Sequence, residues 1–133
     1  METIVILGST GSIGCNALQV IKLHQDKYKV FALTANGNVD LLTEQCSEFE
    51  PQFAFALNRE ANQQLKKNLL AFNSKTIVLD DENSLDWLAS HKETNTVISA
   101  IVGAAGLKPT MAAANSGKKI LLANKETLVM AGE

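Results

Sequence analysis

Short apolar runs recur along the whole chain, and each has the length of a β-strand. They lie at residues 4–7, 30–33, 53–57, 76–79, 97–102 and 120–123. Within each run the apolar residues are nearly continuous rather than alternating with polar ones. This is typical of a strand whose two faces are both covered by helices. The pattern therefore predicts a buried, mainly parallel sheet of about six strands.

The segments between these runs carry apolar residues at helical spacing. The stripes consist of Ile13, Ala17 and Ile21, of Leu42, Cys46 and Phe49, and of Ala61, Leu65, Leu69 and Phe72. Such stripes pack helices against a sheet. A weaker helix is expected around Leu85 and Leu88, and Pro109 and Gly117 are placed to start and stop a fifth. This alternation predicts one α/β domain with a Rossmann-like, doubly wound sheet and helices on both faces.

A glycine-rich motif, VILGSTGSIG at residues 5–14, connects the first expected strand to the first expected helix. Backbone N–H groups and the positive end of the helix dipole bind phosphate at such a position. We expect Gly8 to turn the strand, Gly11 to admit a diphosphate, and Gly14 to let the helix pack closely. Hydroxyl donors are expected from Ser9, Thr10 and Ser12. A tight turn without a ligand is the alternative, and a P-loop is excluded because no GK[ST] follows.

The end of the second run indicates which dinucleotide is favoured. Sites specific for NAD usually place Asp or Glu there, about 20 residues after the glycines, to bind the ribose 2′-hydroxyl. Residues 34–38 read TANGN, and the first carboxylate is Asp40. An uncharged strand end would not repel a 2′-phosphate, so NADP is favoured over NAD. Asn38 is alternatively the N-cap of the second helix, and the two roles are compatible.

Two later segments reach the same carboxyl edge of the predicted sheet, where α/β proteins bind ligands. Residues 103–106, GAAG, are small enough for a ligand to lie against the backbone, and a tight turn with ordinary packing is the alternative. Asn124, Lys125 and Glu126 follow the sixth run and could hold a nicotinamide ring and a substrate. Lys125 suits a hydroxyl, carbonyl or phosphate group. The alternative is the solvated first turn of a helix, with Glu126 favoured by the dipole.

Other polar residues point to no further chemistry. Asp80, Asp81 and Glu82 resemble paired carboxylates but are typical of a solvated helix start. His24 and His91 have no partners at metal-ligand spacing and are interpreted as structural.

Composition narrows the partners to small molecules. Twelve basic and fourteen acidic residues give a net charge of −2, so no broad positive field favours nucleic acid or anionic membranes. Cys15 and Cys46 are too few for a disulfide framework and are expected to be reduced thiols on helices. No apolar run approaches the roughly 20 residues that cross a bilayer. A cytoplasmic location is therefore expected.

Three motifs together resemble a known family. The motifs are ILGSTGSIG at residues 6–14, IVGAAGL at 101–107 and LLANKE at 121–126. In their order and separation they resemble the motifs of the N-terminal domain of 1-deoxy-D-xylulose 5-phosphate reductoisomerases. The resemblance covers nearly the whole chain. It implies an enzyme of non-mevalonate isoprenoid biosynthesis, which isomerises its sugar phosphate and reduces the product with NADPH to 2-C-methyl-D-erythritol 4-phosphate.

The resemblance also implies roles for particular residues. NADPH would contact Thr10, Gly11, Ser12, Ile13, Gly37, Asn38, Asn124 and Glu126, and Lys125 would contact the substrate. It assigns no catalytic residue and no metal ligand within this sequence. In one departure, the family commonly has a glycine and a basic residue just before the asparagine, where this chain has Asn36 and Gly37.

Members of that family are much longer than this chain. Their ligands for divalent metal (Mg or Mn) and their closing lid lie beyond the segment that matches LLANKE. Residues 1–133 are therefore expected to be a truncated NADPH-binding domain without the catalytic and C-terminal domains, inactive alone, and ending within a helix. The full-length protein is expected to be a homodimer. The alternatives are the nucleotide domain of another dehydrogenase, such as homoserine dehydrogenase, and a non-catalytic dinucleotide-binding module.

Overall fold

Strands and helices alternate along the chain in the computed structural model, which describes residues 1–101, 107–123 and 128–131. The strands are β1 (Glu2–Leu7), β2 (Tyr28–Ala35), β3 (Phe53–Ala56), β4 (Ile77–Val78), β5 (Thr96–Ser99), β6 (Lys119–Ala123) and β7 (Leu128–Ala131). The helices are α1 (Ser12–Leu23), α2 (Val39–Phe49), α3 (Arg59–Ala71), α4 (Ser84–Ser90) and α5 (Leu107–Asn115). Within these ranges no helix combines the length and the apolar character that a membrane span requires.

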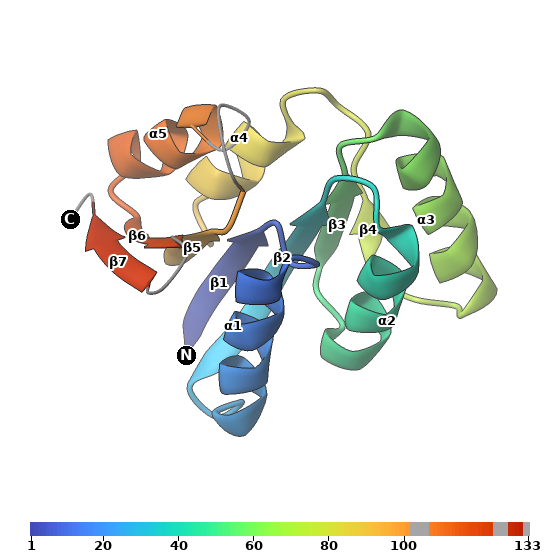
Figure 1. Ribbon diagram of the computed structural model, residues 1–133, viewed down its shortest axis with the longest axis horizontal. Helices are drawn as coiled ribbons and strands as arrows, with labels where there is room; N and C mark the ends of the chain where they lie inside the picture. The colour runs from blue at the N-terminus through green and yellow to red at the C-terminus, as the bar shows by residue number, and fades with distance from the viewer. Residues whose placement is uncertain (102–106, 124–127, 132–133) are drawn as a thin grey trace.

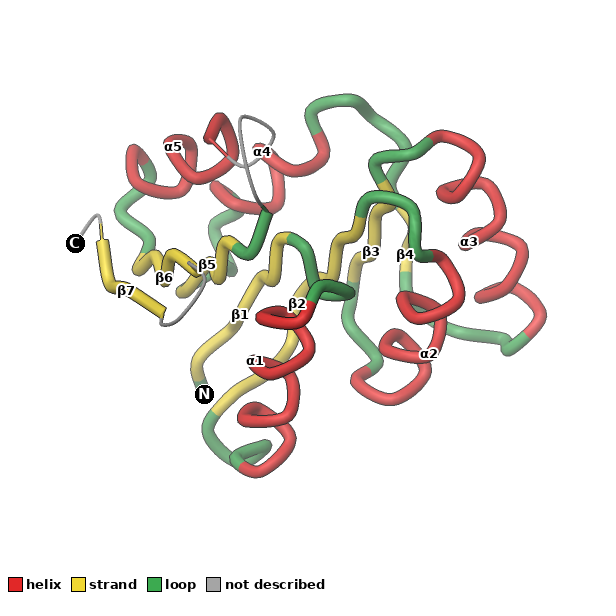
Figure 2. The backbone as a smooth tube through the Cα atoms, viewed as in Figure 1, coloured by secondary structure: helices red, strands yellow, loops and turns green. Residues whose placement is uncertain are grey.

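All the strands form one sheet in the order β4-β3-β2-β1-β5-β6-β7 (Figures 1 and 2). The first six strands pair in parallel, and β7 pairs antiparallel to β6. The chain moves outward from β1 to β4 and then returns to the other side of β1 as β5. The strand order therefore reverses between β1 and β5, which is the place where doubly wound folds bind their ligands.

Two hydrophobic cores cover the two faces of the sheet. Ile4 and Ile6 of β1 pack in the core that α1, α2 and α3 complete, whereas Val5 and Leu7 pack in the core with α4 and α5. Figure 1 shows these two groups of helices on opposite sides of the strands. The period of two along β1 thus sends successive side chains into different cores. The predicted Rossmann-like, doubly wound α/β fold with helices on both faces is confirmed.

The fourth strand is less buried than predicted. The run at residues 76–79 forms only the two-residue β4, and Ile77 is 52% exposed. The reason is its place in the sheet, because β4 has a neighbouring strand on one side only. Phe72, predicted to belong to the apolar stripe of α3, instead follows that helix as its C-cap and is 60% exposed.

The prediction that the chain continues as a helix after Glu126 is wrong. Leu128–Ala131 form β7, which pairs antiparallel with β6 from Leu128 opposite Ala123 to Ala131 opposite Ile120. Four consecutive apolar residues with a β-branched valine are a strand signal. The prediction of a helix relied instead on the polar residues just before them, whose sequence is typical of a helix start.

The two cysteines lie on helices, as predicted. Cys15 is part of α1 and Cys46 is part of α2, and both are free thiols. Burial raises the pKa of Cys46 to about 12, since the thiolate would lose its hydration. Cys46 therefore acts as a small apolar residue of the core.

Helix α3 provides a matched test of the packing. Leu65 is fully buried in the core, whereas Leu70 on the same helix is 79% exposed. We expect Leu65→Ala to lower the free energy of unfolding by about 2–5 kcal/mol, since it removes buried methyl groups and leaves a cavity. Leu70→Ala should change it by less than about 0.5 kcal/mol. Urea denaturation followed by circular dichroism measures both, and equal effects would contradict the assignment of faces.

Candidate functional site

The glycine loop lies where β1 meets its two neighbours. Gly8 follows the last residue of β1 and has a φ of +87°, a conformation that favours glycine. Its N–H donates to the carbonyl oxygen of Thr34 in β2 at 3.1 Å. On the other side, a Cβ at Gly8 would lie 3.1 Å from the carbonyl carbon of Ala100, directly after β5. The turn predicted at Gly8 is therefore confirmed.

The base of the loop is tied to β2 and α2 through Ser9. The Ser9 N–H donates to the carbonyl oxygen of Thr34 at 2.7 Å, and its hydroxyl donates to Gln45 Oε1 at 2.7 Å. Gln45 Nε2 donates back to the Ser9 carbonyl oxygen at 2.8 Å. Ser9 is fully buried. The expectation that its hydroxyl serves a phosphate is wrong, because that hydroxyl already donates within the fold.

The first turn of α1 packs directly on this loop. A methyl group at Gly14 would come within 2.7 Å of Ser9 Cα, and the Gly8 carbonyl oxygen would be nearer still. No real Cβ tolerates such contacts, and both neighbours are backbone atoms that cannot easily move. Gly14 thus permits the close approach of helix and loop, as predicted.

The tip of the loop is open. A Cβ at Gly11 would have no neighbour nearer than the Gly8 carbonyl oxygen at 3.8 Å, and Gly11 is exposed. Gly11 is the N-cap of α1 and offers no side-chain hydrogen bond, whereas α2 and α3 are capped by the side chains of Asn38 and Asn58. The first N–H groups of α1 thus have no side-chain cap, and the space beside Gly11 is open. Such an arrangement fits an anionic diphosphate.

The structure brings two groups of predicted cofactor residues to one edge of the sheet. Thr10–Ile13 form the tip and the start of α1, with Ser12 exposed and Thr10 and Ile13 half-buried. Gly37 and Asn38 lie at the end of the neighbouring strand β2 and are exposed. Asn38 Oδ1 accepts from the N–H of Leu41 at 3.3 Å. The N-cap role of Asn38 is confirmed, and its contact with a cofactor stays a prediction.

The remaining predicted residues lie outside the described residues. These are the small residues Gly103, Ala104, Ala105 and Gly106, and the polar residues Asn124, Lys125 and Glu126. The described strands β5 and β6 that precede them are parallel to β1, so both segments follow carboxyl ends at the same edge.

Sequence reasoning missed two features of the site. Gln45 holds the loop through Ser9, and its position three residues after Leu42, on the buried stripe of α2, was the available signal. A hollow of about 700 Å³ at the carboxyl ends of β3 and β4 was also missed, and Arg59 and Asn62 line it. Asn62 is buried and bridges the Ala56 N–H, at 2.9 Å, to the Leu79 carbonyl oxygen, at 2.7 Å.

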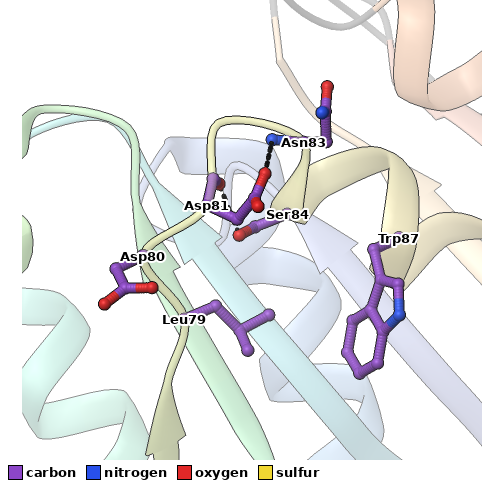
Figure 3. A pocket seen from close by; sticks show the side chains of 6 residues that line it. All are labelled: Leu79, Asp80, Asp81, Asn83, Ser84 and Trp87. Carbon is purple, nitrogen blue, oxygen red and sulfur yellow. Dashed lines mark hydrogen bonds between the residues drawn. The ribbon is translucent and has the colours of Figure 1, made fainter.

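A second hollow, of about 320 Å³, lies beside the segment between β4 and α4 (Figure 3). Its carboxylates have local partners. The Asp81 carboxylate accepts from the Asn83 N–H at 2.8 Å, and Asp80 forms an ion pair with Lys66 at 2.9 Å. The hydrogen bond from Lys66 lowers the pKa of Asp80. These contacts fit the interpretation of a solvated helix start, and no His, Cys, Asp or Glu cluster suited to a metal occurs among the described residues.

The two histidines contact aromatic rings. His24 lies edge-on to Tyr28 with ring centroids 6.4 Å apart, and His91 lies 5.0 Å from Phe31 and 4.8 Å from Trp87. These contacts agree with the structural role expected for both.

Comparison with known proteins shows the family of this chain. The family model described as 1-deoxy-D-xylulose 5-phosphate reductoisomerase matches residues 4–132. The reductoisomerase of Haemophilus ducreyi is 51% identical over all of this chain, and that of Nitrosomonas europaea is 53% identical over 97% of it. The chain spans about a third of the length of these relatives, 34% and 31% respectively.

Two solved structures of reductoisomerases are also similar to this chain. A crystal structure of a reductoisomerase in complex with magnesium is 41% identical, with a TM-score of 0.89 over 95% of this chain and 31% of its own. The Zymomonas mobilis reductoisomerase in complex with NADPH is 36% identical, with a TM-score of 0.85 over 94% of this chain and 32% of its own. The chain therefore belongs to the 1-deoxy-D-xylulose 5-phosphate reductoisomerase family.

Proposed function

We propose that residues 1–133 form the NADPH-binding domain of a 1-deoxy-D-xylulose 5-phosphate reductoisomerase. The observation that carries this proposal is the open loop tip at Gly11, ahead of a helix that lacks a side-chain cap. The similar structure of the Zymomonas mobilis reductoisomerase, which is a complex with NADPH, supports the choice of ligand. The uncharged end of β2 also favours NADPH over NADH.

The proposed coenzyme lies across the carboxyl edge of the sheet. Its diphosphate accepts hydrogen bonds from the backbone N–H groups of Thr10, Ser12 and Ile13 at the positive end of α1. The Gly11 N–H donates to the Gly8 carbonyl oxygen at 3.4 Å, so Gly11 contributes the open space rather than a donor. The adenosine half lies toward the ends of β2 and β3, next to Gly37 and Asn38. The nicotinamide half points toward the segments after β5 and β6, where Asn124 and Glu126 contact it and Lys125 holds the substrate.

The proposed reaction is that of the family. The full-length protein isomerises 1-deoxy-D-xylulose 5-phosphate and reduces the product to 2-C-methyl-D-erythritol 4-phosphate. NADPH supplies the hydride when it is bound, and these residues hold and orient it. The full-length protein also uses a divalent metal in this proposal, because a similar structure is a complex with magnesium. The family resemblance implies that the metal ligands lie beyond the segment that matches LLANKE.

We further propose that the full-length protein is a cytoplasmic homodimer. The nearly balanced charge, with a net value of −2, supports a small-molecule enzyme rather than a partner of nucleic acid or membrane. The homodimer is carried over from the family resemblance alone.

The 133-residue chain alone should not turn over its substrate. It would hold the hydride donor without the metal that activates the sugar phosphate. In an assay with 1-deoxy-D-xylulose 5-phosphate, Mg²⁺ and NADPH, the absorbance of NADPH should fall no faster than in a control without protein. Steady oxidation of NADPH that depends on the sugar phosphate would contradict this prediction.

The choice of coenzyme is tested by titration. We expect NADPH to bind the chain more tightly than NADH when binding is followed by coenzyme fluorescence. The end of β2 presents no carboxylate that would hold the ribose 2′-hydroxyl of NADH or repel the 2′-phosphate of NADPH. When the titration is repeated at a higher salt concentration, the affinity for NADPH should fall more than the affinity for NADH, since the extra charge of NADPH makes its binding more sensitive to screening. Tighter binding of NADH would overturn the choice.

Two glycines of the loop give a matched pair of variants. Gly11→Ala should leave folding intact, because its Cβ meets only one atom at 3.8 Å, yet weaken NADPH binding about tenfold or more by intruding on the diphosphate. Gly14→Ala should destabilise the fold by about 1–3 kcal/mol through overpacking, although alanine favours helices. Thermal unfolding and NADPH titration separate the two effects. Unchanged NADPH affinity in a folded Gly11→Ala variant would contradict the proposed diphosphate site.

A further inference from the structure

The proposed NADPH site contains an unbalanced charge. The adenosine 2′-phosphate of NADPH is dianionic or nearly so near neutral pH, but residues 34–38 at the end of β2 carry no charged side chain. The loop after β1, at residues 8–11, carries none either. A preference for NADPH requires an attraction to this phosphate, and neither segment provides a cation.

The turn after β3 lies directly against the end of β2. The Leu57 N–H donates to the Ala35 carbonyl oxygen at 2.9 Å, and the Asn58 N–H donates to the Asn36 carbonyl oxygen at 2.9 Å. A Cβ at Gly37 would be 3.9 Å from Asn58 Cβ. The residue that follows Asn58 is Arg59, the first residue of α3. The parallel pairing of β2 and β3 thus brings Arg59 close to the uncharged strand end.

Arg59 is the one lysine or arginine in the three segments that follow β1, β2 and β3. The loops and first helical turns after β1, β2 and β3 cover residues 8–15, 36–42 and 57–62, and no other lysine or arginine occurs in them. They contain two carboxylates, Asp40 and Glu60. Arg59 is exposed and forms neither an ion pair nor a side-chain hydrogen bond within the described part of the chain, whereas Lys66 of the same helix pairs with Asp80.

The position of Arg59 is not explained by the stability of its helix. A cation at the first residue of α3 faces the positive end of the helix dipole, which is unfavourable. The cap of α3 is already made by Asn58 Oδ1, which accepts from the Ala61 N–H at 3.0 Å. Arg59 instead lines the hollow of about 700 Å³ at the carboxyl end of β3, beside Phe55 and Leu57. The same hollow is also lined by Lys66, Asp80, Asp81 and Glu82. Of these, Lys66 and Asp80 pair with each other at 2.9 Å.

We propose that Arg59 binds the 2′-phosphate of NADPH and sets the preference of this domain for NADPH over NADH. The inference rests on the proposed function, since it assumes that the coenzyme occupies the loop after β1. The planar guanidinium can donate two hydrogen bonds to one phosphate, a geometry that a lysine ammonium does not match. Asn36 and Asn38, at the end of β2, are placed to add amide donors to the same group.

The test compares the affinities of NADPH and NADH for four forms of the 133-residue chain, by fluorescence titration. The forms are the unsubstituted chain, Arg59→Gln, Arg59→Lys, and the control Lys67→Gln, which removes an exposed charge further along α3. We expect Arg59→Gln to weaken NADPH binding about ten- to hundredfold while NADH binding changes less than twofold. The affinity of Arg59→Lys for NADPH should lie between those of the unsubstituted chain and Arg59→Gln. Lys67→Gln should leave the affinities for both coenzymes unchanged. Circular dichroism of each variant verifies folding.

The outcomes separate this inference from the proposed function. If the unsubstituted chain binds NADPH and folded Arg59→Gln binds it equally well, the assignment of Arg59 is overturned and the proposed function stands. Equal weakening of NADPH and NADH would also overturn it, because the effect would not depend on the 2′-phosphate. If the unsubstituted chain binds neither coenzyme, the proposed function fails and the inference fails with it.

Discussion

The buried hydrogen bonds between Ser9, Thr34 and Gln45 are the interactions on which the site depends. They fix the base of the loop after β1 to a neighbouring strand and to α2. Gly14 then allows α1 to pack against the same backbone. The base of the loop is therefore rigid, whereas its tip at Gly11 has no close neighbour. A loop held in this way can present N–H groups to a ligand without the entropic cost of becoming ordered when the ligand binds.

The sheet topology explains why the ligand site lies there and extends in both directions. The order of strands reverses between β1 and β5. Because crossovers are right-handed, α1 to α3 therefore cover one face of the sheet, and α4 and α5 cover the other. The carboxyl ends of β2 and β3 extend the edge on one side, and those of β5 and β6 extend it on the other. Residues far apart in sequence, such as Gly11 and Arg59, are brought to one surface by strand pairing alone.

The sequence predicted the fold because the relevant signals are local. Continuous apolar runs marked the six parallel strands, and the glycine spacing correctly predicted the turn at Gly8 and the close packing at Gly14. Other features depend on partners distant in sequence. Nothing near Ser9 indicates that its hydroxyl faces Gln45, 36 residues later, rather than a phosphate. The strand Leu128–Ala131 was missed because the polar residues before it resemble a helix start.

A crystal structure of the 133-residue chain with bound NADPH tests the central claim most directly. The account predicts diphosphate oxygens within hydrogen-bonding distance of backbone N–H groups between Thr10 and Ile13, with Ser9 still bonded to Gln45. Coenzyme bound elsewhere, for example in the hollow beside Trp87 with the loop tip vacant, would contradict it.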